Sequence, residues 1–140
     1  MDLKAVLQNP PTQFADSIIG KKYLDVVSFY FTELNLDSAK IYLDQASGFI
    51  QNASSTYLEN DIYLYYNTYY LYNSNLDTAI AIAEAVLKNN PNELAKATAL
   101  SGIGNAYYFQ GDFLNALDYY LKGLEIEEII SPEKNQCYIF

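Results

Sequence analysis

The fold is decided by the stretch Gly104–Tyr120, which reads GNAYYFQGDFLNALDYY. Apolar and small residues recur there at helical spacing, stop at Gly111-Asp112 and then resume, which predicts two amphipathic helices joined by a very short turn. The Asp112 carboxylate can accept hydrogen bonds from the unpaired N–H groups in the first turn of the second helix. Small residues at Gly104 and Ala116 would let the two helices approach closely where they cross.

The same pattern occurs in two earlier copies. The alanines Ala39, Ala79 and Ala116 lie near the start of the second helix of each copy, 40 and 37 residues apart. A tyrosine precedes each alanine by nine residues, and an Asn or Asp suited to cap the helix precedes it by four. The tyrosines are Tyr30, Tyr70 and Tyr107, and the caps are Asn35, Asn75 and Asp112. Fixed offsets in three copies predict a helical repeat with these tyrosines and alanines in its core.

The order of a small residue, Asn-Ala-Tyr-Tyr, Gly-Asp-aromatic, Ala and Tyr-Tyr resembles a tetratricopeptide (TPR) repeat, whose usual length is about 34 residues. The longer spacing here is similar to that of some signalling members of the superfamily. The resemblance implies an all-α fold, an antiparallel helix-pair solenoid wound as a right-handed superhelix. We expect one domain over residues 1–140, with repeats at 20–53, 57–90 and 94–130, and the start of an incomplete further helix at 131–140.

The amino-acid composition and the net charge exclude some classes of function. Hydrophobic residues make up 51% and charged residues 18% of the chain, which is typical of a globular protein. The net charge is −9, and all eight basic residues are lysines. Without arginine or a basic patch, we expect no binding to nucleic acid and no docking on anionic membranes.

The chain also lacks the residues that usually carry out catalysis or bind metal ions. There is no histidine, the commonest general base and metal ligand, and Cys137 is the only cysteine. Glu127 and Glu128 are adjacent, so on a helix they do not face each other. We therefore expect no enzymatic activity, no metal and no cofactor. The sequence shows no secretory signal and no membrane-spanning stretch, which predicts a cytoplasmic location.

The first helix of each repeat lines the inner surface of a TPR superhelix, and the resemblance implies a peptide-binding groove there. In it, aromatic faces would bury an extended ligand, and Ser28, Thr68 and Asn105 would bond its backbone. The alternative interpretation, that individual residues pack between repeats instead, stays open at this point. The groove residues expected from the resemblance are Ser28, Phe31, Tyr65, Thr68, Tyr72, Ser101, Asn105, Tyr108 and Phe109.

TPR domains that bind chaperone C-termini use a clamp of Lys, Arg and Asn for the ligand carboxylate. The matching positions here hold none of these residues, so charge-assisted bonds to a carboxylate are not available there. The positions are Leu24, Ser28, Tyr65, Thr98 and Gly102. The sequence therefore predicts that chaperone tails do not bind through such a clamp.

The function that fits these observations is binding of a protein or peptide without catalysis. We expect the sensory, regulatory or scaffolding segment of a signalling protein. The alternative is a small acidic chaperone similar to the TPR chaperones of type III secretion, and an enzyme is the least favoured class. Ile129 and Ile130 do not resemble the polar outer face that usually ends a TPR array, so self-association through an uncapped C-terminal end is also expected.

Overall fold

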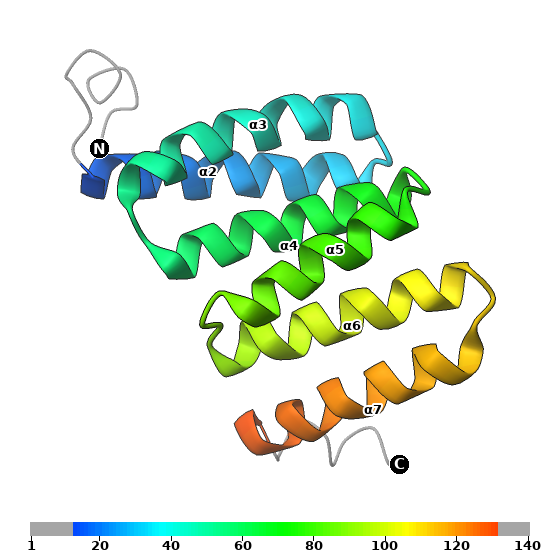
Figure 1. The fold of residues 1–140 in the computed structure, drawn as a ribbon. Coiled ribbons are helices and arrows are strands. Elements are labelled where there is room, and N and C mark those ends of the chain that lie inside the picture. The colour runs from blue at the N-terminus through cyan, green and yellow to red at the C-terminus, as the bar shows by residue number, and fades with distance from the viewer. Residues whose placement is uncertain (1–12, 132–140) are drawn as a thin grey trace. The chain divides into compact units, whose positions relative to one another are not determined.

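A computed structural model describes residues 13–131 of the chain, and every regular element in that range is an α-helix (Figure 1). The all-α, helical-repeat prediction is confirmed. The six helices form three successive pairs, each joined by a short turn. They are α2 (Gln13–Thr32), α3 (Leu36–Ala53), α4 (Thr56–Tyr72), α5 (Leu76–Lys88), α6 (Glu93–Phe109) and α7 (Phe113–Ile130). The predicted further helix at 131–140 and Cys137 lie outside the described residues.

The turn inside each helix pair has the same backbone geometry. Leu34, Ser74 and Gly111 lie in the left-handed region, with φ of 55°, 61° and 82°. The N–H of the next residue donates to a carbonyl five residues back, at 2.9 Å in all three turns, which is the bond of a Schellman motif. These bonds run from Asn35 to Tyr30, from Asn75 to Tyr70 and from Asp112 to Tyr107. The constant offset between tyrosine and alanine thus reflects one turn geometry used three times.

Leu34→Gly is expected to raise the free energy of unfolding by about 0.5–1 kcal/mol. A left-handed conformation costs an L-residue about 1–2 kcal/mol, and the extra freedom of unfolded glycine offsets part of that gain. Leu34 is exposed, so little buried surface is lost. Urea denaturation of the variant and of Gly111→Ala, its reverse at the matching turn, measures both effects. Destabilisation by Leu34→Gly would contradict the described turn.

Two of the three predicted caps make the expected hydrogen bond. The Asn35 side chain accepts from the Ser38 N–H at 3.1 Å, and the Asp112 carboxylate accepts from the Asn115 N–H at 3.2 Å. Asn75 occupies the N-cap position of α5, but its side chain makes no capping bond. At that turn the bond from the Asn75 N–H to the Tyr70 carbonyl is present all the same. Backbone geometry alone therefore ends α4 and starts α5.

The chain divides into two compact units, with the boundary between Ile62 and Tyr63 inside α4. In the first unit α2 and α3 pack side by side (Figure 1). Tyr30 stacks on Tyr42 with ring centroids 5.4 Å apart, and the core beside them contains Leu43, which is fully buried. The expectation of a single domain over the whole chain stays a prediction.

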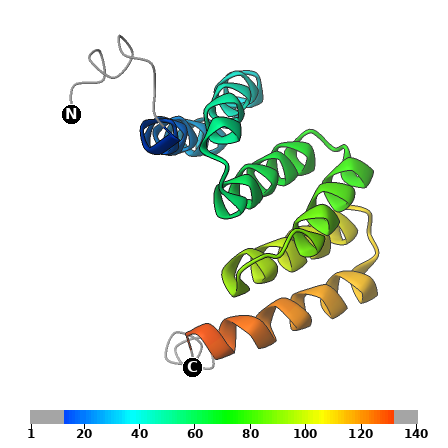
Figure 2. The ribbon, with the colours of Figure 1, turned by 60° about the vertical axis from the view of Figure 1, so that its left-hand side comes forward.

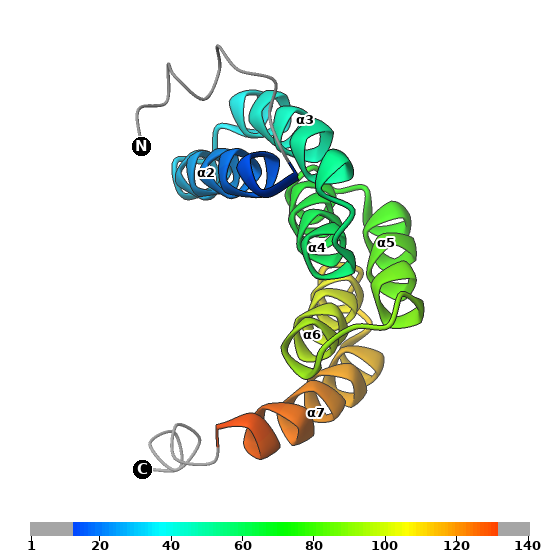
Figure 3. The same ribbon diagram turned by 90° about the vertical axis from the view of Figure 1, so that its left-hand side faces the viewer.

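The second unit, from Tyr63 onward, contains the rest of α4 and helices α5, α6 and α7. Helix α6 packs against both α5 and α7, and Figure 2 shows α6 and α7 as an antiparallel pair. Leu71, Ala79 and Ala106 form a cluster that joins α4, α5 and α6. A second cluster holds Ile103 against α5 and the start of α6. Figure 3 shows the result: α4 and α6 are neighbours, and α5 lies along one side of both.

Of the positions predicted to form the core, the alanines lie in it and the tyrosines lie at its edge. Ala39, Ala79 and Ala116 are all buried. The tyrosines are half-buried: Tyr70 and Tyr107 pack against the buried clusters, and Tyr30 stacks on Tyr42. Tyr107 stacks on Tyr119 at 5.6 Å, just as the tyrosine of the first pair stacks on its partner twelve residues later.

Candidate functional site

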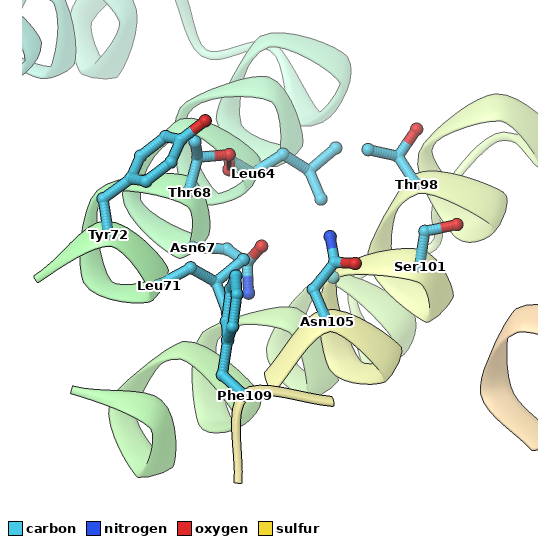
Figure 4. A pocket seen from close by; sticks show the side chains of 10 residues that line it. Leu64, Asn67, Thr68, Leu71, Tyr72, Thr98, Ser101, Asn105 and Phe109 are labelled. Atoms are coloured by element: carbon cyan, nitrogen blue, oxygen red, sulfur yellow. Dashed lines mark hydrogen bonds between the residues drawn. The ribbon is translucent and has the colours of Figure 1, made fainter. Parts of the chain in front are cut away.

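A pocket of about 200 Å³ lies between α4 and α6, within the second unit (Figure 4). Helix α5 contributes nothing to its lining, because α5 packs on the other side of these two helices. Ten residues line the pocket: Leu64, Asn67, Thr68, Leu71, Tyr72, Thr98, Ser101, Gly102, Asn105 and Phe109.

Helical periodicity explains which side chains face the pocket. On α4, Leu64, Thr68 and Leu71 follow one another at spacings of four and three. On α6, Ser101 and Asn105 are four residues apart, which also places them on one face. Two helices that present such faces to each other form a groove along their line of contact.

None of the ten lining side chains is charged. Apolar surface comes from two leucines and from the rings of Tyr72 and Phe109, which are both exposed at the rim. Polar groups come from two asparagines and from four hydroxyls, those of Thr68, Tyr72, Thr98 and Ser101. A mostly apolar cavity with a few placed hydrogen-bonding groups is the usual composition of a ligand site.

Asn67 is the buried polar group of the pocket, with 3% of its surface exposed. Its side-chain Nδ2 donates to the Ala79 carbonyl of α5 at 2.8 Å. Its Oδ1 lies where a side chain at Gly102 would be, because a Cβ built on Gly102 would be only 2.5 Å away. A glycine in α6 therefore makes room for the amide, and the bond to α5 turns its oxygen toward α6.

The side-chain amide of Asn105 is held through its oxygen, whereas that of Asn67 is held through its nitrogen. The Tyr120 hydroxyl of α7 donates to the Asn105 Oδ1 at 2.6 Å. Gly104 lets the ring approach, since a Cβ there would lie 2.8 Å from two atoms of the Tyr120 ring. Burial raises the pKa of the Tyr120 phenol above its usual value of 10.0, and nearby Tyr108 adds to the shift. The hydroxyl therefore keeps its proton at neutral pH and can act as the donor.

The threonine hydroxyls are oriented by their own helices. Thr68 donates to the Leu64 carbonyl at 3.1 Å, and Thr98 donates to the Leu94 carbonyl at 2.8 Å. A hydroxyl has one proton and two lone pairs, so each oxygen is left as an acceptor toward the pocket.

Five of the nine predicted groove residues line this pocket, namely Thr68, Tyr72, Ser101, Asn105 and Phe109. Tyr65 is half-buried outside the lining, and Tyr108 is exposed with its ring near Phe109 and Phe113.

The two remaining predicted residues, Ser28 and Phe31, belong to the first unit. Phe31 is 8% exposed, and the Ser28 hydroxyl donates to the Leu24 carbonyl at 3.1 Å. The role of all nine residues in binding stays a prediction. For Phe31 the burial favours the packing interpretation.

Two residues that orient the pocket are missing from the sequence-based prediction. Asn67 stands twelve residues before Ala79, and the matching positions in the other copies are Val27 and Gly104. Val27 is fully buried. The asparagine at position 67, where the first copy has a buried valine, was thus a signal that could have been found in the sequence. The sequence contains no such signal for Tyr120, because its hydrogen bond to Asn105 depends on how α6 and α7 cross.

Other kinds of site find no support in the part of the chain that the structure describes. No group of three His, Cys, Asp or Glu side chains is placed there to hold a metal ion. No helix in residues 13–131 combines the length and the hydrophobicity that a membrane span requires. The expected absence of catalysis, of cofactors and of membrane binding stays a prediction, as does the cytoplasmic location.

Comparison with protein families shows to which family the chain belongs. The family model described as AimR transcriptional regulator-like matches residues 10–138. The chain belongs to this AimR-like family. Neither the curated proteins nor the solved structures contain a significant match to it. The match covers both compact units, while the TPR relationship stays a resemblance.

Proposed function

We propose that this chain is the non-catalytic, peptide-binding segment of a regulator of transcription, and that the pocket between α4 and α6 receives part of the peptide. The observation that carries the proposal is an uncharged pocket in which two oriented amides stand among apolar side chains. Family membership supports the regulatory role. It also favours that role over the small acidic secretion chaperone.

The size of the pocket indicates how much of a ligand it takes. A volume of about 200 Å³ corresponds to roughly seven water molecules, at about 30 Å³ each. Drug-sized ligands occupy about 300–1,000 Å³. The pocket therefore suits one side chain of a longer ligand together with its backbone, and the rest of the ligand would lie along α4 and α6. The exposed rings of Tyr72 and Phe109 at the rim offer apolar surface for it.

Charge defines which peptides should bind. The pocket offers no cation for a carboxylate, and the net charge of −9 repels acidic ligands at longer range. An uncharged segment with apolar side chains fits best. Binding should depend only weakly on salt, since no ion pair is formed.

Asn105→Ala is expected to weaken peptide binding about 5- to 150-fold, which corresponds to 1–3 kcal/mol for a peptide group left without its partner. A peptide array finds the best ligand, and calorimetric titration measures it against the parent and the variant. Asn105 is exposed when the pocket is empty, so stability should change little.

Asn52→Ala is the matched control, because Asn52 is exposed on α3 in the other unit. Equal affinities for the parent and Asn105→Ala would contradict the proposal. So would a steep fall in affinity with salt, since charge would then carry the binding.

The remaining partners expected from the sequence are separate proposals. Helix α7 exposes Leu114, Leu117, Leu121 and Leu124, which recur at three and four residues along one face. That face favours the self-association expected at this end of the chain, which light scattering would detect as a doubled mass. The expectation that this segment itself does not bind nucleic acid stays a prediction, because its family is one of transcriptional regulators.

A further inference from the structure

Tyr120 lies outside the pocket, on α7, yet it fixes one of the polar groups inside it. Its hydroxyl donates to the Asn105 Oδ1 at 2.6 Å, across the α6–α7 crossing. The ring lies directly on Gly104, the neighbour of Asn105, where any side chain would collide with it. The position of the hydroxyl is thus set by the closest approach of two helices, so Tyr120 is well placed to hold the amide.

A side-chain amide that is not held can present either its oxygen or its NH₂ group to a ligand. In this pocket both amides are held, in opposite senses. Asn105 uses its oxygen on Tyr120, so its Nδ2 is left as a donor. Asn67 uses its Nδ2 on the Ala79 carbonyl, so its Oδ1 is left as an acceptor. Figure 4 shows the Asn67 oxygen and the Asn105 nitrogen facing the space between α4 and α6.

We propose that Tyr120 is a positioning residue through which the pocket binds an amide group: it holds the Asn105 Nδ2 as the donor, and the Asn67 Oδ1 is the acceptor. The inference rests on the proposed function and goes further by naming the chemical group that is read. A trans amide carries its C=O and its N–H on opposite edges. The C=O would accept from Asn105 on α6, and the N–H would donate to Asn67 on α4.

The same chemistry could come from a peptide backbone or from the side chain of Gln or Asn in the ligand. N-methylisobutyramide imitates the backbone group, and isobutyramide imitates the side chain. Methyl isobutyrate has nearly the same shape, but it has no N–H to donate to Asn67. The apolar end of each probe fits among Leu64, Leu71 and Phe109. The amide-to-ester ratio of affinities therefore measures the hydrogen bonding with the apolar contact held constant.

The experiment titrates the full chain with each of the three probes and follows the side-chain amide signals of Asn67 and Asn105 by NMR. The parent should prefer its better amide over the ester by about tenfold, because the ester leaves the buried Asn67 oxygen without a partner. Tyr120→Phe removes only the hydroxyl and keeps the ring on Gly104. That variant frees the Asn105 amide, whose Nδ2 serves the C=O of all three probes, so it should bind each probe about fivefold more weakly and keep the preference, while its urea midpoint stays close to that of the parent.

Tyr119→Phe is the matched control, one residue away on the same helix. The Tyr119 ring stacks on Tyr107, so losing its hydroxyl should leave the affinities for all three probes unchanged. Whichever amide binds more tightly identifies the source of the group, and either result supports the proposal.

Three results would overturn the proposal: no preference in the parent, probe affinities in Tyr120→Phe equal to those of the parent, or no shift of either asparagine with any probe. Affinities that Tyr120→Phe leaves unchanged while an array peptide still requires Asn105 would refute the role of Tyr120 and leave the proposed function standing. A preference that is present while array peptides ignore Asn105 would refute the proposed function alone.

Discussion

Ile103→Ala is expected to lower the free energy of unfolding by about 2–5 kcal/mol. Ile103 is 1% exposed and is the largest side chain of a cluster whose other members are three alanines and Val86. The buried alanines cannot move side-chain atoms into the space that the isoleucine leaves, and the larger, partly buried side chains packed against the cluster, such as Leu64 and Leu87, can fill only part of it. Urea denaturation followed by circular dichroism measures the loss.

The control is Ile129→Ala, the same substitution on α7, where the side chain is 79% exposed. It should change the free energy of unfolding by less than about 0.5 kcal/mol. Similar losses for the two variants would mean that Ile103 does not lie in the core, and the packing of α5 against α6 would be wrong.

Gly104→Leu should cost about 1–3 kcal/mol by overpacking. A Cβ at this position would lie 2.8 Å from the Tyr120 ring and 3.3 Å from the Ala116 carbonyl oxygen. A ring and a backbone oxygen cannot yield as the end of a flexible side chain can, so α6 and α7 would have to separate. The melting temperature of the variant reports the cost.

Gly48→Leu provides the opposite case. Gly48 is exposed within α3, and nothing lies within 4 Å of a Cβ built there. Leucine is a better helix former than glycine by up to about 1 kcal/mol, so this variant should be slightly more stable. A rise in stability at both sites would mean that helix propensity and not crossing geometry controls the response.

The helices were predictable because their signals are local. A tyrosine carbonyl, the turn and the cap all lie within six residues, and they recur at fixed offsets in three copies. The residues in the left-handed conformation were harder to predict from the sequence. Gly111 indicates such a conformation by itself, whereas Leu34 and Ser74 adopt it only because the surrounding turn bonds require it.

The pocket was partly predictable for the same reason. Periodicity shows which residues share a helix face, and three of the residues that it put on the groove face, Thr68, Ser101 and Asn105, line the pocket. It does not show which side chain finds a partner far along the chain. Asn67 is buried because Gly102, 35 residues later, leaves room for it. The bond of Tyr120 likewise depends on a contact across two helices.

The central claim is that a peptide occupies the pocket between α4 and α6, and NMR of leucine and isoleucine methyl groups tests it most directly. Leu64 and Leu71 line the pocket, whereas Leu114 and Ile129 are exposed on α7. When the best array peptide is added to the methyl-labelled chain, the signals of Leu64 and Leu71 should shift in proportion to occupancy, and those of Leu114 and Ile129 should not. Shifts confined to Leu114 and Ile129 would place the ligand on α7 and contradict the claim.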